Sequence, residues 1–273
     1  MKNEKTYELV LTALFTAIIV IMAFTPLGYI PLVVINATVI HIPVILGALF
    51  LGPKKGAFLG FVFGLTSFIN NTFKAATASA FVFSPVLAAN VVGVSGIFKS
   101  TYICFVPRIL VGIIPYFVYV LIHKLLKGEQ KVWKIVINAA AAVILFISVR
   151  AFINRLMDNT GGMAGTIAGL ILGIILFIVL TAAVGKKSTA STALAYAGLS
   201  GAFTNTLFVM SGIYILYKDA YANAVGVAGD AVIDVIMGVV SFNGIVEAVI
   251  AAILIAGVGL VLTRMKPIKG LND

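Results

Sequence analysis

The sequence predicts an all-α protein that crosses a membrane several times, and three observations support this fold class. Hydrophobic residues make up 62% of the 273 residues and charged residues only 10%. Mean hydropathy is +1.16, whereas a soluble domain carries about 25% charged residues. The apolar residues also come in long runs, which is the pattern of helices that cross a bilayer. We therefore expect one membrane domain over residues 1–273.

Eight apolar runs approach the length of about 20 residues that a membrane-spanning helix needs. They are 8–25, 37–52, 55–70, 103–123, 134–155, 163–184, 191–217 and 237–263. The second and third runs are short because Gly52, Pro53 and Gly56 separate them.

The first run is almost wholly apolar, and Ala13 and Ala17 lie one helical turn apart on it. Small residues at this spacing let the backbone of another helix approach closely in lipid. We expect this face to dock a partner helix. The polar residues before the run resemble the start of a signal sequence, but no small-residue cleavage site follows, so a retained helix is expected.

Two later runs carry glycines at every fourth position, a spacing that is typical of helix packing rather than of ligand contact. They are Gly56, Gly60 and Gly64 in the third run and Gly165, Gly169 and Gly173 in the sixth.

Three connections, 26–40, 71–102 and 218–236, are unusual because they lack a clear span yet contain many apolar residues. Long connections in compact proteins are usually functional or disordered. We expect these three to lie as lids over the outer face.

The distribution of positive charge predicts the orientation. Threading the eight runs back and forth places most of the 19 lysines and arginines on one face, and this positive face is normally cytoplasmic. Both termini are then expected in the cytoplasm, with the chain in the cell membrane. The net charge of +10 follows this pattern, so we expect no nucleic-acid partner.

Ionisable residues inside a membrane span usually mark a functional site. Arg108 lies about one turn inside the fourth run, and Glu247 lies in the outer half of the eighth. Other polar side chains fall at the same expected depth, and with these two they form the predicted substrate site: Thr38, His41, Asn70, Asn71, Asn205 and Asn243.

Structural alternatives exist for the same residues. Arg108 could extend to the outer interface, or pair with Glu247 without binding anything. Asn205 and Asn243 could bridge neighbouring helices.

The sequence contains no recognisable catalytic or cofactor motif. GKKS at 185–188 is not a P-loop, because position 180 is leucine rather than glycine. There is no aspartate-rich metal motif, and of two histidines His123 lies at the cytoplasmic edge. We expect no catalytic residue, no cofactor and no metal.

The order of these segments resembles the substrate-binding S components of energy-coupling factor (ECF) vitamin transporters, in the branch of folate and pantothenate members. The similar segments are IPVILGALFLGPKKGAFLGFVFGLTSFINN (42–71), VPRILVGI (106–113), GAFTNT (201–206) and FNGIVEA (242–248). The resemblance implies a six-helix core over 8–123 and 191–263. Residues 124–190 then form an inserted helix pair.

The resemblance also implies the partners. The chain would bind a vitamin from outside, with Arg108 facing the ligand beside Asn205 and Asn243. Ala13 and Ala17 would contact a coupling transmembrane subunit, and two ATPase subunits would supply the energy.

The residue types point to a small anionic substrate. An arginine fork pairs a carboxylate with two hydrogen bonds, and asparagine and threonine suit hydroxyls and amides. The one tryptophan, Trp133, lies at the cytoplasmic end and offers no stacking sandwich for a flat ring. Pantothenate, with one carboxylate, one amide and two hydroxyls, fits best, and folate remains open.

Other functions remain open as well. A stand-alone secondary transporter would use Glu247 as a proton site and would not need the Ala13 face. A membrane scaffold would use Arg108 and Glu247 as a structural pair. A membrane enzyme is the third alternative.

Overall fold

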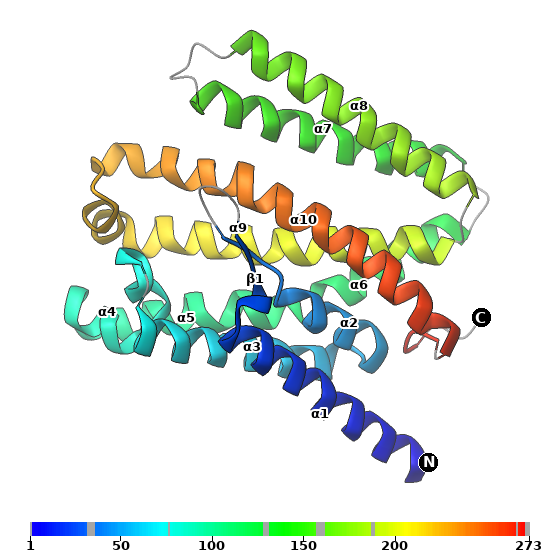
Figure 1. The fold of residues 1–273 in the computed structure, drawn as a ribbon, viewed down its shortest axis with the longest axis horizontal. Coiled ribbons are helices and arrows are strands. Elements are labelled where there is room, and N and C mark those ends of the chain that lie inside the picture. The colour runs from blue at the N-terminus through cyan, green and yellow to red at the C-terminus, as the bar shows by residue number, and fades with distance from the viewer. Residues whose placement is uncertain are drawn as a thin grey trace.

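The computed structural model describes residues 2–31, 36–75, 77–127, 131–156, 162–186, 189–265 and 267–270, and these are almost entirely helical. The long helices lie side by side in one elongated bundle (Figure 1). This confirms the predicted all-α polytopic fold.

The first third of the chain forms three helices and a short hairpin. The elements are α1 (Lys2–Phe24), the 3-10 helix η1 (Pro26–Gly28), β1 (Tyr29–Pro31), β2 (Asn36–Thr38), α2 (His41–Leu51) and α3 (Pro53–Lys74). Strands β1 and β2 pair antiparallel, with Tyr29 opposite Thr38. Gly52 separates α2 from α3 with a φ of 86°, a conformation that favours glycine, and Pro53 is well placed at the start of α3.

The next elements are η2 (Ala78–Phe83), α4 (Pro85–Val92), α5 (Val94–Val111) and α6 (Ile114–Lys127). Residues 71–102, which we expected to form a lid without a span, are therefore mostly helical. Ser84 caps α4 by accepting a hydrogen bond from the Leu87 backbone N–H at 3.2 Å. Phe81 and Val82 of η2 are buried, so the segment packs into the bundle.

The last elements are α7 (Lys131–Leu156), α8 (Gly162–Lys186), α9 (Thr189–Val225), η3 (Gly229–Ala231) and α10 (Val232–Met265). Helices α9 and α10 extend into 218–236, so this expected lid is also largely helical. Helix α9 is kinked at Tyr217, whose φ of −134° is not helical.

Each of the eight predicted runs overlaps a helix of the structure. Within the described residues, five helical stretches are long and apolar enough to cross a membrane: Glu4–Phe24, Pro53–Lys74, Val94–Leu126, Thr189–Val225 and Gly229–Met265. The second run coincides with the shorter α2. The prediction of eight spans is not tested by these lengths.

The glycine series pack helices together, as predicted. A Cβ atom on Gly60 would lie only 2.2 Å from the carbonyl oxygen of Arg108. Such contact is possible only without a side chain, so α3 and α5 approach at backbone distance. The glycines of α8 meet α7 in the same way, at the carbonyl groups of Arg150, Phe146 and Ala142.

Both termini lie at the same end of the bundle (Figure 1). There the Glu8 carboxylate accepts hydrogen bonds from Lys55 Nζ and from Lys269 Nζ, each at 2.6 Å. These ion pairs join the start of α1, the α2–α3 turn and the C-terminal segment. Two of the predicted positive clusters, represented by Lys55 and Lys269, therefore meet at this end.

Two hydrophobic cores lie along the bundle. The first, towards the termini, includes Phe15, Leu49, Leu194 and Ile255. The second, towards the opposite end, includes Phe81, Ile103, Val209, Tyr217 and Ile236.

Candidate functional site

The predicted polar residues of three helices fall between the two hydrophobic cores. On α5, Arg108 lies between Ile103 of the second core and Val111 of the first. On α9, positions 204–206 lie between the two cores, and on α10 positions 243–247 do the same. Polar and ionisable side chains that form such a polar band between two apolar cores of a membrane protein usually mark a functional site.

Arg108 is buried at 6% exposure, so its side chain does not extend to the interface. Its Nη1 donates a hydrogen bond to the Ile103 carbonyl at 2.6 Å. The guanidinium lies 5.0 Å from the ring centre of Phe83 and 5.6 Å from that of Phe63. Cation–π contact with rings from η2 and α3 fixes the group in place without neutralising its charge.

Glu247 is buried at 5% exposure and connects three elements. Its Oε1 accepts a hydrogen bond from the Thr38 backbone N–H at 2.7 Å, and its Oε2 accepts one from Thr206 Oγ1 at 3.4 Å. The positive charge of Arg108 also acts on this carboxylate. Glu247 thereby holds the β1–β2 hairpin and α9 against α10, close to Arg108.

Sequence reasoning missed Thr206. Its neighbour Asn205 was selected from GAFTNT for its expected depth in the span. The available signal was that a hydroxyl next to an asparagine, in an otherwise apolar span, needs a partner of its own.

Asn205 and Asn243 lie at the same level of the antiparallel α9–α10 pair. Two packing contacts set this register, because Gly198 faces the Ala251 backbone and Gly244 faces the Thr206 side chain. The side-chain amide oxygens of both asparagines are buried and accept no hydrogen bond from the described residues. A buried acceptor without a donor is costly, so a ligand N–H or O–H would be favoured here.

His41 is fully buried at the first position of α2, three residues after Thr38. Helix α2 packs against α9 and α10. His41 therefore belongs to the helices around the polar band, next to the hairpin that Glu247 holds.

Asn70 and Asn71 have local structural explanations. Asn70 Nδ2 donates to the Ala23 carbonyl at 3.3 Å, which joins α3 to the end of α1. Asn71 Nδ2 donates to the Ser67 carbonyl of its own helix at 2.8 Å.

A second surface lies on α1. One face of this helix, with Phe15, Ile19 and Ala23, is buried in the first core. The opposite face borders an open groove of about 540 Å³, lined by Leu9, Thr12, Ala13, Thr16, Ala17, Val20, Ile21 and Phe58. Ala13 and Ala17 are both exposed in it, which leaves room for a helix to approach the α1 backbone.

Within the described part of the chain, no group of three or more His, Cys, Asp or Glu residues could hold a metal ion.

Comparisons with known proteins relate this chain to membrane transporters. Residues 8–154 match the family model described as ECF transporter, substrate-specific component. The chain is 43% identical over 128 residues to a protein named Pantothenic acid transporter PanT from Lactococcus lactis subsp. cremoris (strain MG1363), an alignment that covers 44% of this chain and 61% of that protein. It is 36% identical over 119 residues to Pantothenate transporter PanT from Leuconostoc mesenteroides subsp. mesenteroides, covering 42% of this chain and 51% of that protein. The similarity thus spans about half to three-fifths of each relative.

Proposed function

Because the chain belongs to the family of ECF transporter substrate-specific components, we propose that it is the specificity subunit of such an importer and that its substrate is pantothenate. The observation that carries this proposal is the polar band between the two cores, where the buried Arg108 lies near Glu247.

The chemistry of the band suits the parts of pantothenate. Arg108 would receive the carboxylate, since charge-assisted pairing with a guanidinium is the strongest hydrogen bonding available there. The buried amide oxygens of Asn205 and Asn243 would accept hydrogen bonds from the hydroxyls or the amide N–H. The names of the two relatives favour pantothenate over folate.

Transport would require partners, and the α1 groove supports one of them. A coupling transmembrane subunit would dock a helix against Ala13 and Ala17, where the α1 backbone is accessible. Two ATPase subunits would supply the energy. With the positive clusters facing the cytoplasm, both termini lie on the cytoplasmic side of the cell membrane.

The hairpin β1–β2 would close the site on one side. It is the connection between α1 and α2, and its end is tied to α10 through Thr38 and Glu247. Ligand exchange would then involve breaking this hydrogen bond.

The test is a calorimetric titration of the purified full chain with pantothenate and with folate, after ligand has been removed by partial unfolding and refolding. We expect saturable binding of pantothenate at one site and much weaker binding of folate. Tight folate binding, or no binding of either vitamin to correctly folded protein, would refute the substrate assignment.

A further inference from the structure

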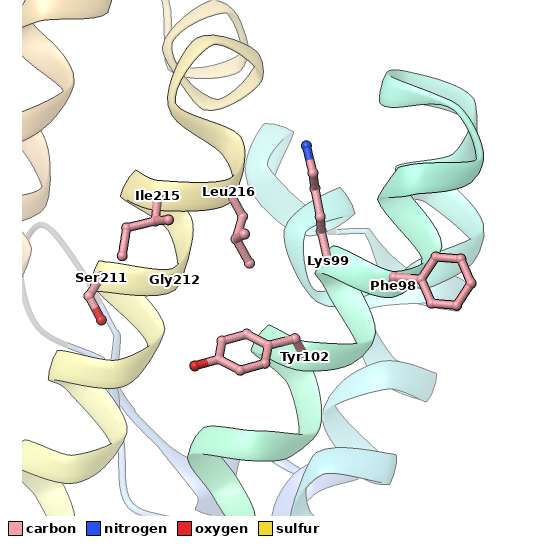
Figure 2. Close-up of a pocket in the computed structure, with 7 residues that line it drawn as sticks. All are labelled: Phe98, Lys99, Tyr102, Ser211, Gly212, Ile215 and Leu216. Atoms are coloured by element: carbon pink, nitrogen blue, oxygen red, sulfur yellow. The ribbon is translucent and has the colours of Figure 1, made fainter.

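A groove of about 360 Å³ lies between α5 and α9 (Figure 2), and it shares no lining residue with the α1 groove. Its walls are apolar side chains that point out of the bundle, with Phe98 at 74% and Ile215 at 75% exposure. Because the chain spans a membrane, these walls face lipid. Gly212 of the lining packs closely on the core, since a Cβ atom there would lie 3.1 Å from Ile103 Cγ1.

The groove has one charged lining residue, Lys99. Its Nζ lies 5.7 Å from the ring centre of Tyr217. Among the described residues, no carboxylate forms a salt bridge with it. The lining contains no acidic residue, so the positive charge of Lys99 has no negative counter-charge within the groove.

Lys99 lies at the depth where a lipid headgroup is expected. It is in the second turn of α5, at the end of the bundle away from the termini (Figure 1). Tyr214 and Lys218 lie near the same level of α9, and their ring and ammonium are in contact. Tyrosine is enriched at the membrane–water interface, and lysine side chains near helix ends extend to it.

The groove runs from this level into the bilayer. Tyr102 lies about one turn deeper on α5. Figure 2 shows its hydroxyl pointing towards α9, whereas the Lys99 side chain points away from Tyr102. We propose that the groove binds one anionic phospholipid, with its phosphate at Lys99 and an acyl chain between Tyr102 and Ile215. A zwitterionic headgroup carries a cation of its own. It would add a second positive charge beside Lys99, where the lining supplies no negative charge.

The test uses delipidated full-length protein in detergent, titrated under native mass spectrometry with phosphatidylglycerol, with phosphatidylcholine of the same chains, or with inorganic phosphate. The parent should bind phosphatidylglycerol about fivefold more tightly than phosphatidylcholine, since one lysine at an anionic surface contributes about 1 kcal/mol. Lys99→Gln should remove this preference. Ser211→Trp, an exposed substitution in the groove, should weaken both lipids. Lys74→Gln is the matched control, because Lys74 is an exposed lysine outside the groove.

Three outcomes would overturn the proposal. The parent could bind both lipids equally, Lys99→Gln could behave as Lys74→Gln does, or inorganic phosphate could displace the lipid, which would identify a site for a free anion. The circular dichroism of each variant checks its fold. The readout does not depend on pantothenate, so failure here leaves the proposed function untouched.

Discussion

At the scale of single residues, Arg108 illustrates how a charge is kept inside an apolar bundle. Two aromatic rings and the Ile103 carbonyl hold the guanidinium, and the Glu247 carboxylate lies near enough to attract it. A buried charge without such partners would cost several kcal/mol. An anionic ligand would add a charge-assisted hydrogen bond to this guanidinium.

We predict that Arg108→Ala weakens pantothenate binding by roughly ten- to a hundredfold, because hydrogen bonds to charged groups contribute about 1.5–3 kcal/mol. Arg108→Lys should restore only part of the affinity, since a lysine lacks the planar fork. Calorimetric titration measures both variants. Arg150→Ala, which removes an exposed arginine of α7, is the control. If Arg108→Ala binds within about twofold of the parent, Arg108 is a structural residue.

At the scale of elements, the β1–β2 hairpin depends on one side chain of a distant helix. The Thr38 N–H donates to Glu247 at 2.7 Å, and the two residues are 209 positions apart. The hairpin has only three residue pairs of its own, and a two-stranded hairpin is marginal by itself. Its position therefore depends on contacts with the bundle.

We predict that Glu247→Ala increases hydrogen exchange of the peptide containing Thr38 by roughly ten- to a hundredfold in ligand-free protein, because a charge-assisted acceptor is lost. Glu247→Gln should increase it much less, since a glutamine carbonyl still accepts from the Thr38 N–H. Mass spectrometry of exchange gives both values. Equal exchange in Glu247→Ala and the parent would show that Glu247 does not hold the hairpin.

Helix α1 has one buried face and one accessible face. A substitution on the accessible face therefore tests docking without disturbing the substrate site. We predict that Ala17→Trp abolishes pantothenate uptake by cells while the purified protein keeps its affinity, because the indole fills the groove beside α1. Leu14→Trp is the matched control, as Leu14 is exposed on α1 outside the groove lining. A parallel loss of affinity in Ala17→Trp would contradict the docking role.

At the scale of the whole molecule, the helix pair α7–α8 packs beside the core. A buried asparagine joins the two parts. The Tyr196 hydroxyl of α9 donates to Asn138 Oδ1 at 2.9 Å, and Asn138 Nδ2 donates to Thr181 Oγ1 at 3.3 Å. Its partner Tyr196 packs against the first core and precedes Asn205 on α9 by nine residues, about 13 Å along the helix. We therefore expect the pair to stabilise the bundle without shaping the site.

We predict that Asn138→Leu lowers the thermal unfolding midpoint by about 2–4 °C, since interhelical hydrogen bonds in membranes average about 0.6 kcal/mol each and two are lost. Tyr196→Phe, which removes one of them, should lower it by about half as much. Pantothenate affinity should change less than twofold in both, as titration would show. A large loss of affinity would mean that the pair reshapes the site.

Several features of the fold and site were predictable from local patterns. Ala13 and Ala17 lie in an accessible groove because the buried residues of α1 occupy the opposite face. The glycine series predicted close helix contacts correctly, since only a missing side chain permits them. Residues 71–102 were expected to lack a span because their alanines, serines and threonines show no clear apolar run, and the structure makes them mostly helical, with α5 beginning at Val94.

The sequence by itself determined that the chain is a bundle of membrane helices, because long apolar runs must satisfy their backbone hydrogen bonds internally in lipid. It also indicated which charged side chains are too costly to bury without a purpose. Only the tertiary structure decided which of them meet. The bond from Thr38 to Glu247, the rings around Arg108 and the partners of Asn70 join segments that are far apart in the chain. Such contacts depend on helix packing and register, which no local pattern encodes.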